Sequence, residues 1–180
     1  MLSDDHFELF QLAPRFALDA SELDRAYQDV QSRVHPDRFA SRSPAERRVA
    51  MQWAARANEA YRTLKSPLLR AAYLCERAGV PIEAETNTAM AGDFLTQQLE
   101  WREALEAAGA ARDDAALARL AVTLEGETAH LIGELADAID WKSDFPRAAA
   151  LVRKLMFLDR FRDEIEIAME SLPTTQRASA

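Results

Sequence analysis

Three adjacent residues, His35, Pro36 and Asp37, carry the groups best suited to chemistry in this 180-residue sequence. An imidazole and a carboxylate two positions apart could form an acid–base pair, cap helix ends or bind a partner protein. Acid–base catalysis would need a nucleophile, a third orienting group or a metal near the pair. The sequence has three histidines and one cysteine, without metal-ligand spacing. We therefore expect no enzymatic activity, metal or cofactor, and the choice lies between a capped turn and an exposed binding loop.

The tripeptide lies between two segments whose apolar residues recur at the spacing of one helix face. Pro36 fixes its own φ and disfavours helical backbone at the residue before it, so the first helix should end near Val34. The second should begin at Ser43-Pro44-Ala45-Glu46, which combines a capping box with proline at the first helical position. The pattern predicts a helical hairpin with the imidazole and carboxylate at its tip. Its apolar positions are Leu23, Tyr27, Val30 and Val34, then Val49, Trp53, Ala57, Ala60 and Leu64.

Composition predicts an all-α protein throughout, because Ala, Leu, Glu and Arg dominate and glycine occurs only five times. Caps and breakers divide the chain into successive helices. Ser3 is expected to cap the first, Asp19-Ala20-Ser21-Glu22 forms a second capping box, and Gly79 and Gly109 should each end a helix. The expected helices are Asp4–Leu12, Asp19–Val34, Pro44–Leu64, Pro67–Ala78, about 88–108, about 113–140 and about 145–171.

Charge divides the chain into two modules. Residues 1–80 carry 12 basic and 11 acidic residues, whereas residues 81–180 carry 10 and 19. An acidic second half argues against binding to nucleic acid. No apolar run approaches the roughly 20 residues needed to cross a bilayer, and the N-terminus does not resemble a signal peptide. The lone Cys75 lies among apolar residues, which predicts a buried thiol in a reducing compartment.

The second module is predicted to be an antiparallel three-helix bundle over residues 88–173, after a linker at 79–87 and before a disordered tail at 174–180. Leucines recur every seven residues at positions 117, 124 and 131, a coiled-coil-like spacing. Gly126 and Gly133 are also seven apart, and each costs roughly 1 kcal/mol relative to alanine inside a helix. A close approach between helices would compensate for that cost, and an accidental pair is the alternative.

Three large apolar residues of this module lie off its apolar stripes. Leu95 and Leu99 fall roughly 100–140° around their helix from Phe94, beside acidic residues, and Phe157 lies about 100° from the stripe of Leu158. A wide core-facing stripe, or contact with the first module, would explain them. An exposed apolar patch with an acidic rim would also explain them, and such a patch is typical of a binding site.

The hairpin around His35-Pro36-Asp37, with the segments that follow it, resembles a J-domain. Those segments are Asn58-Glu59-Ala60-Tyr61-Arg62-Thr63-Leu64-Lys65-Ser66-Pro67 and Arg70-Ala71-Ala72-Tyr73. The resemblance covers residues 1–78. It implies that the tripeptide docks on a DnaK-class chaperone and stimulates its ATP hydrolysis.

Segments 93–103 and 152–159 extend the resemblance to nearly the whole chain. A J-domain joined to an acidic three-helix bundle is similar to the HscB family of iron–sulfur co-chaperones. The bundle segments that carry the similarity are Asp93-Phe94-Leu95-Thr96-Gln97-Gln98-Leu99-Glu100-Trp101-Arg102-Glu103 and Val152-Arg153-Lys154-Leu155-Met156-Phe157-Leu158-Asp159. The resemblance implies delivery of the iron–sulfur scaffold IscU to the specialised chaperone HscA in the bacterial cytoplasm. It assigns chaperone binding to His35, Pro36, Asp37, Arg25, Arg33 and Arg38, and scaffold binding to Leu95, Leu99, Glu100, Glu103 and Phe157.

Several residues depart from the family pattern. Thr96 stands where a methionine follows the first interface leucine, and Ala107 stands where a further glutamate is found. Arg38 replaces a lysine. A general J-domain co-chaperone for other protein clients remains the alternative function, but that class would carry a Gly/Phe-rich or cysteine-rich segment after the J-domain, and this sequence has neither.

Overall fold

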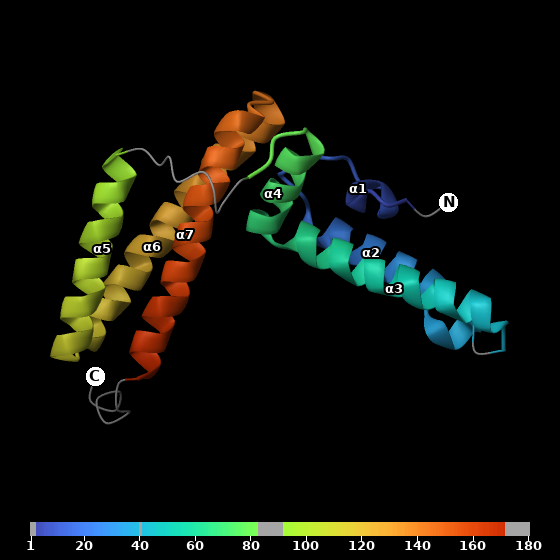
Figure 1. The fold of residues 1–180 in the computed structure, drawn as a ribbon, viewed down its shortest axis with the longest axis horizontal. Coiled ribbons are helices and arrows are strands. Elements are labelled where there is room, and N and C mark those ends of the chain that lie inside the picture. Colours follow the sequence, from blue (N-terminus) through green and yellow to red (C-terminus); the bar gives the residue numbers. More distant parts are fainter. Residues whose placement is uncertain (1–2, 40, 83–91, 172–180) are drawn as a thin grey trace. The chain divides into compact units, whose positions relative to one another are not determined.

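The computed structural model describes residues 3–39, 41–82 and 92–171, and over these residues the chain is helical with no strand (Figure 1). It forms two compact units. The N-terminal unit comprises Met1–Pro81 and Ala136–Ala148, and the C-terminal unit comprises Ile82–Leu135 and Ala149–Ala180. Among the described helices, none is long and apolar enough to span a membrane.

The predicted helical hairpin is present as α2 (Ala20–Val34) and α3 (Pro44–Lys65), which lie side by side (Figure 1). The backbone of His35 is extended, at φ −57° and ψ 128°, so α2 ends where the proline predicts. Ser43 and Glu46 form the predicted reciprocal capping box at the start of α3. The tip between the helices is more regular than expected, because Pro36–Phe39 forms a single 3₁₀ turn, η1.

Two shorter helices, α1 (His6–Leu9) and α4 (Pro67–Arg77), complete the core of the N-terminal unit. Asp5, not the predicted Ser3, caps α1, because its carboxylate accepts hydrogen bonds from the backbone amides of residues 7 and 8. Gly79 ends α4 as predicted, at φ +78°, a conformation that glycine adopts without strain. The buried side chains of this core include Phe7, Leu9, Phe10, Phe16, Leu23, Val30, Val34, Ala57, Leu64, Leu74 and Cys75.

The segment Ala136–Ala148 belongs to the N-terminal unit, which the sequence did not indicate. The helix predicted over about 113–140 is α-helical only as α6 (Asp114–Ala136) and continues as a π-helical turn, η2 (Asp137–Trp141). Within this turn the carboxylate of Asp140 accepts hydrogen bonds from the backbone amides of Phe16 and Ala17, at 2.6 and 2.8 Å. Asp140 therefore satisfies two backbone donors of the segment that leads into α2.

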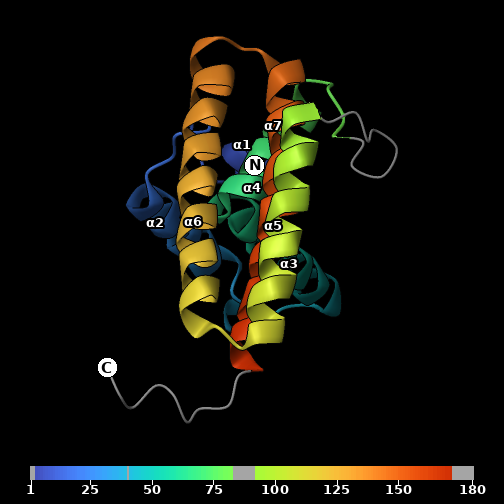
Figure 2. The same ribbon diagram turned by 90° about the vertical axis from the view of Figure 1, so that its left-hand side faces the viewer.

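The C-terminal unit is a three-helix bundle made of α5 (Gly92–Ala111), most of α6, and α7 (Phe145–Glu170) from Ala149 onward; the three helices lie side by side (Figure 2). Gly109 does not end α5; the helix continues to Ala111 and closes at Arg112, whose φ is +52°. The predicted start at residue 88 and the tail at 174–180 lie outside the described residues. The predicted apolar stripes form the core, with Leu117, Leu120, Leu124, Leu131, Leu135, Leu151, Leu155, Leu158, Phe161 and Ile165 buried.

The expectation for Gly126 and Gly133 is wrong. Apart from its chain neighbours and the nearby backbone of its own helix, a methyl group added to either glycine would meet no described atom within 4 Å, so neither marks a close approach between helices. Both residues are exposed on α6. Their cost in helix propensity is therefore not offset by packing in the free chain.

Candidate functional site

The predicted tripeptide lies at the free end of the α2–α3 hairpin. The side chains of His35 and Asp37 are 53 % and 90 % exposed, and their Nδ1 and Oδ2 atoms are 3.5 Å apart. The backbone amide of Asp37 also donates a long hydrogen bond of 3.4 Å to the same Nδ1. Solvent surrounds both groups, so the tripeptide has the exposure that docking on another protein requires.

The three arginines predicted to assist the tripeptide are all exposed and partly held in place. Arg25 and Arg33 each donate from Nε to the carbonyl four residues earlier, at 3.2 Å. Arg38 donates from Nη1 to the carbonyl oxygen of Ser32, at 2.8 Å. Each guanidinium keeps further N–H groups that can bind a carboxylate of a partner.

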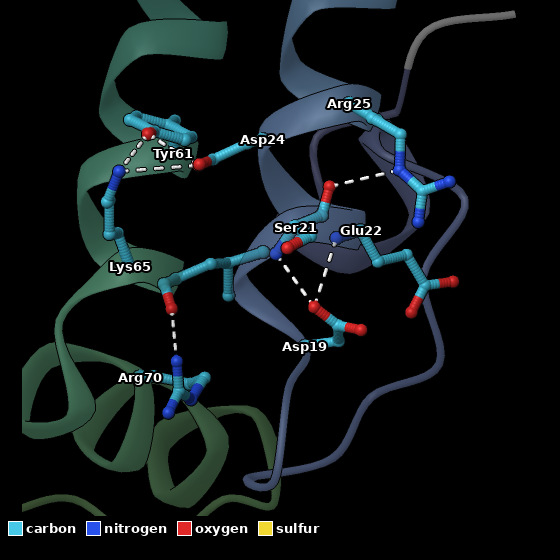
Figure 3. Close-up of polar contacts among 9 residues, drawn as sticks. Asp19, Ser21, Glu22, Asp24, Arg25, Tyr61, Lys65 and Arg70 are labelled. Carbon is cyan, nitrogen blue, oxygen red and sulfur yellow. Dashed lines mark hydrogen bonds and ion pairs between the residues drawn. The ribbon is translucent and has the colours of Figure 1, made fainter.

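Polar contacts join α2 and α3 at the end of the hairpin away from its tip (Figure 3). The hydroxyl of Tyr61 donates to Asp24 at 2.7 Å, and Lys65 contacts the same carboxylate at 3.3 Å. Both hydrogen bonds lower the pKa of Asp24, chiefly the one from Tyr61. One turn closer to the tip, Asn58 accepts a hydrogen bond of 2.8 Å from Tyr27 of α2.

These bridging residues were quoted as part of the resemblance, but their roles were not predicted. Asn58, Tyr61 and Lys65 recur at spacings of three and four along α3, the signature of one helix face. That spacing could have identified a polar face. It could not have identified the partners, because Asp24 and Tyr27 lie more than 30 residues away.

The second candidate surface follows successive turns of α5. Leu95 and Leu99 are 49 % and 59 % exposed, which excludes the core-facing interpretation for both. Glu100 and Glu103 are exposed beside them. The structure therefore places four of the predicted scaffold-binding residues on the solvent side of one helix, as an apolar stripe with an acidic margin.

Phe157 differs from the leucines, because it is only partly exposed. Its ring stacks on Phe161 and Trp101, with centroids 5.7 and 6.4 Å apart, and meets Phe94 edge-on at 5.7 Å. Phe157 is therefore not a freely exposed member of the patch, because its ring packs within the bundle. Phe157 joins α7 to α5 at the edge of the core and presents only part of its surface to a partner.

Two cations next to this aromatic group were not predicted as site residues. The guanidinium of Arg102 lies 5.9 Å from the ring centre of Phe157, and the ammonium of Lys154 lies 5.1 Å from that of Phe94. Both arrangements are cation–π contacts. The seven-residue spacing of Phe94 and Trp101 was the only sequence signal for this group.

The residues that depart from the family pattern are also exposed. Thr96 directs its hydroxyl to the carbonyl oxygen of Gly92 in its own helix, at 3.2 Å. Ala107 offers no polar group. At these two positions the surface of α5 therefore carries a hydroxyl and a methyl group in place of the methionine and the glutamate that the resemblance implies.

Comparison with known proteins identifies a family and close relatives. The family described as the HSCB C-terminal oligomerisation domain matches residues 90–166. The chain is 52 % identical over 168 residues to the co-chaperone protein HscB homolog of Bordetella pertussis, covering 93 % of this chain and 98 % of the relative. It is 51 % identical over 173 residues to the homolog of Burkholderia cenocepacia, covering 96 % and 98 %.

Solved structures show the same similarity. Chaperone HscB from Vibrio cholerae matches with a TM-score of 0.81 and 36 % identity, over 94 % of this chain and 99 % of that one. Human co-chaperone protein HscB matches with a TM-score of 0.85 and 28 % identity, over 91 % and 81 %. Because about half of all positions agree with curated relatives over nearly the full length of both chains, this protein belongs to the HscB family of co-chaperones.

Proposed function

We propose that this co-chaperone binds an IscU-type iron–sulfur scaffold and delivers it to an HscA-type chaperone of the DnaK class, whose ATPase it stimulates. The observation that carries the proposal is that each compact unit presents one exposed surface of the predicted type. His35 and Asp37 protrude from the N-terminal unit, and Leu95 and Leu99 protrude from the C-terminal unit.

The tripeptide acts by binding one state of the ATPase better than another. A ligand shifts a conformational equilibrium only as far as its affinities for the two states differ. His35, Pro36 and Asp37 therefore bind the hydrolysis-competent state more tightly, and Arg25, Arg33 and Arg38 add charge-assisted contacts. The contacts between α2 and α3 hold the two helices of the hairpin together before binding.

The scaffold binds to the α5 surface. Leu95, Leu99 and the exposed part of Phe157 provide the apolar contact, and Glu100 and Glu103 provide hydrogen-bond acceptors at its margin. Because one chain carries both surfaces, the scaffold and the ATPase are held at a high effective concentration relative to each other.

The proposed location is the reducing bacterial cytoplasm, and the state of the only cysteine is consistent with it. Cys75 is buried in the N-terminal unit. Burial raises the pKa of its thiol to about 11, so the group stays protonated and unreactive near neutral pH.

Substitution of the tripeptide tests the proposal. His35→Gln and Asp37→Asn should each abolish stimulation of the ATPase while the melting temperature stays unchanged, because both side chains are exposed. His130→Gln is a matched control, since His130 is an exposed histidine of α6, 68 % accessible. Full stimulation by both tripeptide variants would exclude docking through the hairpin tip.

A further inference from the structure

Trp141 is the most exposed large apolar residue in the part of the chain that the structure describes, and it has no role in the proposed function. It is 82 % exposed. No described aromatic ring or cation stacks on its indole. Tryptophan is enriched at protein interfaces, because its ring combines a large apolar surface with an N–H donor. Trp141 therefore raises the question of what covers it.

The π-helical turn η2 directs this side chain outward. In an uninterrupted α-helix, residue 141 would lie about 60° from the buried Ala138, toward the inner side of the chain. The turn is wider than an α-helical one, and the amide of Lys142 closes it by donating to the carbonyl oxygen of Asp137 at 3.1 Å. The extra residue rotates Trp141 away from the inner side, and such turns occur frequently at functional sites.

A cavity of about 580 Å³ lies beside Trp141 within the N-terminal unit. This volume falls in the range of sites that enclose a small ligand or a large side chain. The apolar part of its lining comprises Leu74, Ala78, Ile139 and Phe145. The cavity therefore offers an apolar interior next to an exposed indole.

The charged residues that line the cavity favour an acidic partner. Arg15 is exposed, and among the described residues no group forms an ion pair or a hydrogen bond with its guanidinium. Arg77 donates from Nε to Asp5 at 2.7 Å and has further N–H groups on its Nη atoms. The one carboxylate of the lining, that of Asp140, already accepts a backbone amide at each oxygen. The cavity therefore has donors for a carboxylate but no comparable acceptor for a cation.

The other charged residues near Trp141 are engaged with each other or with the backbone. Lys142 pairs with Asp137. Asp144 accepts a hydrogen bond from the backbone amide of Arg147 at 3.1 Å, at the start of α7. These groups therefore leave the recognition of a charged partner to Arg15 and Arg77.

Asp140 joins the two sides of the cavity. Its hydrogen bonds to the amides of Phe16 and Ala17 connect the segment that carries Arg15 to the turn that carries Trp141. The backbone positions of Arg15 and Trp141 are therefore held relative to each other before a partner binds.

We propose that this cavity binds an acidic segment of a partner protein that carries a large apolar side chain. The apolar side chain enters the cavity against Trp141, and neighbouring carboxylates pair with Arg15 and Arg77. Tryptophan and arginine are among the residue types that most often dominate the binding energy of protein interfaces. The site uses none of the residues assigned to the ATPase or to the scaffold, so it goes beyond the proposed function.

Synthetic peptides test the proposal on the full chain. Three short fluorescent peptides carry a central leucine flanked by glutamate, by glutamine or by lysine, and a fourth carries a central alanine flanked by glutamate. Anisotropy titration should show that the glutamate-flanked leucine peptide binds about tenfold more tightly than each of the other three. Absence of binding by this peptide, or equal binding of the four, would overturn the proposal.

Variants of the full chain locate the site. Trp141→Ala and Arg15→Gln should each weaken binding of the glutamate-flanked leucine peptide about five- to tenfold, with an unchanged melting temperature because both side chains are exposed. Arg119→Gln and Met51→Ala are matched controls, since each removes an exposed side chain of the same kind elsewhere, and both should bind like the wild type. Wild-type affinity in the folded Trp141→Ala or Arg15→Gln variant would exclude this cavity as the site.

Discussion

Truncation of Leu95 and Leu99 to alanine separates binding from stability most clearly. Both residues lie on the solvent side of α5 and are 49 % and 59 % exposed. If they form the scaffold site, the exposed half of each side chain becomes buried only when the scaffold binds. The two substitutions should therefore weaken binding while the bundle remains folded.

The expected magnitude follows from the exposed fractions. Complete burial of a leucine side chain contributes about 1.5–3 kcal/mol, so the exposed half of each leucine corresponds to about 1–1.5 kcal/mol. Each truncation should reduce affinity for the scaffold about five- to tenfold. Each truncation also removes the half of the leucine side chain that already contacts α5. This loss should lower the free energy of unfolding by about 1 kcal/mol or less, because no closed cavity is left behind.

Phe157→Ala should behave differently from the leucine variants. Its ring stacks on Trp101 and Phe161, so truncation removes contacts of the free bundle as well as contacts with a partner. We expect a loss of about 1–3 kcal/mol of unfolding free energy, below the 3–5 kcal/mol typical of a fully buried phenylalanine. Affinity for the scaffold should fall in addition.

Calorimetric titration with an IscU-type scaffold measures the affinity of each variant. Urea denaturation of the same variants measures their free energy of unfolding. Val122→Ala is a matched control, since Val122 of α6 is 67 % exposed and lies outside the proposed site. Unchanged affinity of a folded Leu95→Ala and Leu99→Ala double variant would refute the assignment of this surface. If the free energy of unfolding of that variant fell by several kcal/mol, the two leucines would be buried in the free protein, and the affinity loss calculated from their exposed fractions would not apply.

Two further predictions concern stability. Burial lowers the pKa of His6 below its ordinary 6.5, and nearby carboxylates only partly oppose this shift. The imidazole of His6 therefore binds a proton more tightly in the unfolded chain than in the folded one. The free energy of unfolding should fall as the pH drops through 6.5. Thermal melts between about pH 7.5 and 5 should show a smaller fall in the His6→Gln variant, and an equal slope would contradict a depressed pKa. Gly126→Ala and Gly133→Ala should each add about 1 kcal/mol in chemical denaturation, because the added methyl meets no described atom. Destabilisation by either change would show that a close neighbour exists.

Local sequence signals predicted most element boundaries, because caps and prolines act through their own backbone. Pro36 ended α2 at Val34, and Ser43 with Glu46 started α3 as expected. The signals failed at two helix ends. Asp5 replaced Ser3 as the cap of α1, and α5 continued through Gly109 to Ala111. A glycine is tolerated within a helix at a modest cost, so it allows an end without imposing one.

The candidate site was predicted to different extents at its two surfaces. His35 and Asp37 are exposed as expected, because a proline turn at a hairpin tip has no core to enter. Helical periodicity placed Leu95 and Leu99 off the stripe of Phe94, and both are exposed. Periodicity could not show that Phe157 completes an aromatic group, since that depends on which residues of α5 face it.

The sequence by itself determined the helices, the tripeptide and the amphipathic faces, since each follows from the spacing of neighbouring residues along one chain segment. Only the tertiary structure decided which distant groups meet. Asp140 bonds the amides of Phe16 and Ala17 from more than 120 positions away, and Tyr61 bonds Asp24 across the hairpin. Such pairs depend on how the helices pack, and packing depends on side-chain shape in three dimensions, which no local pattern contains.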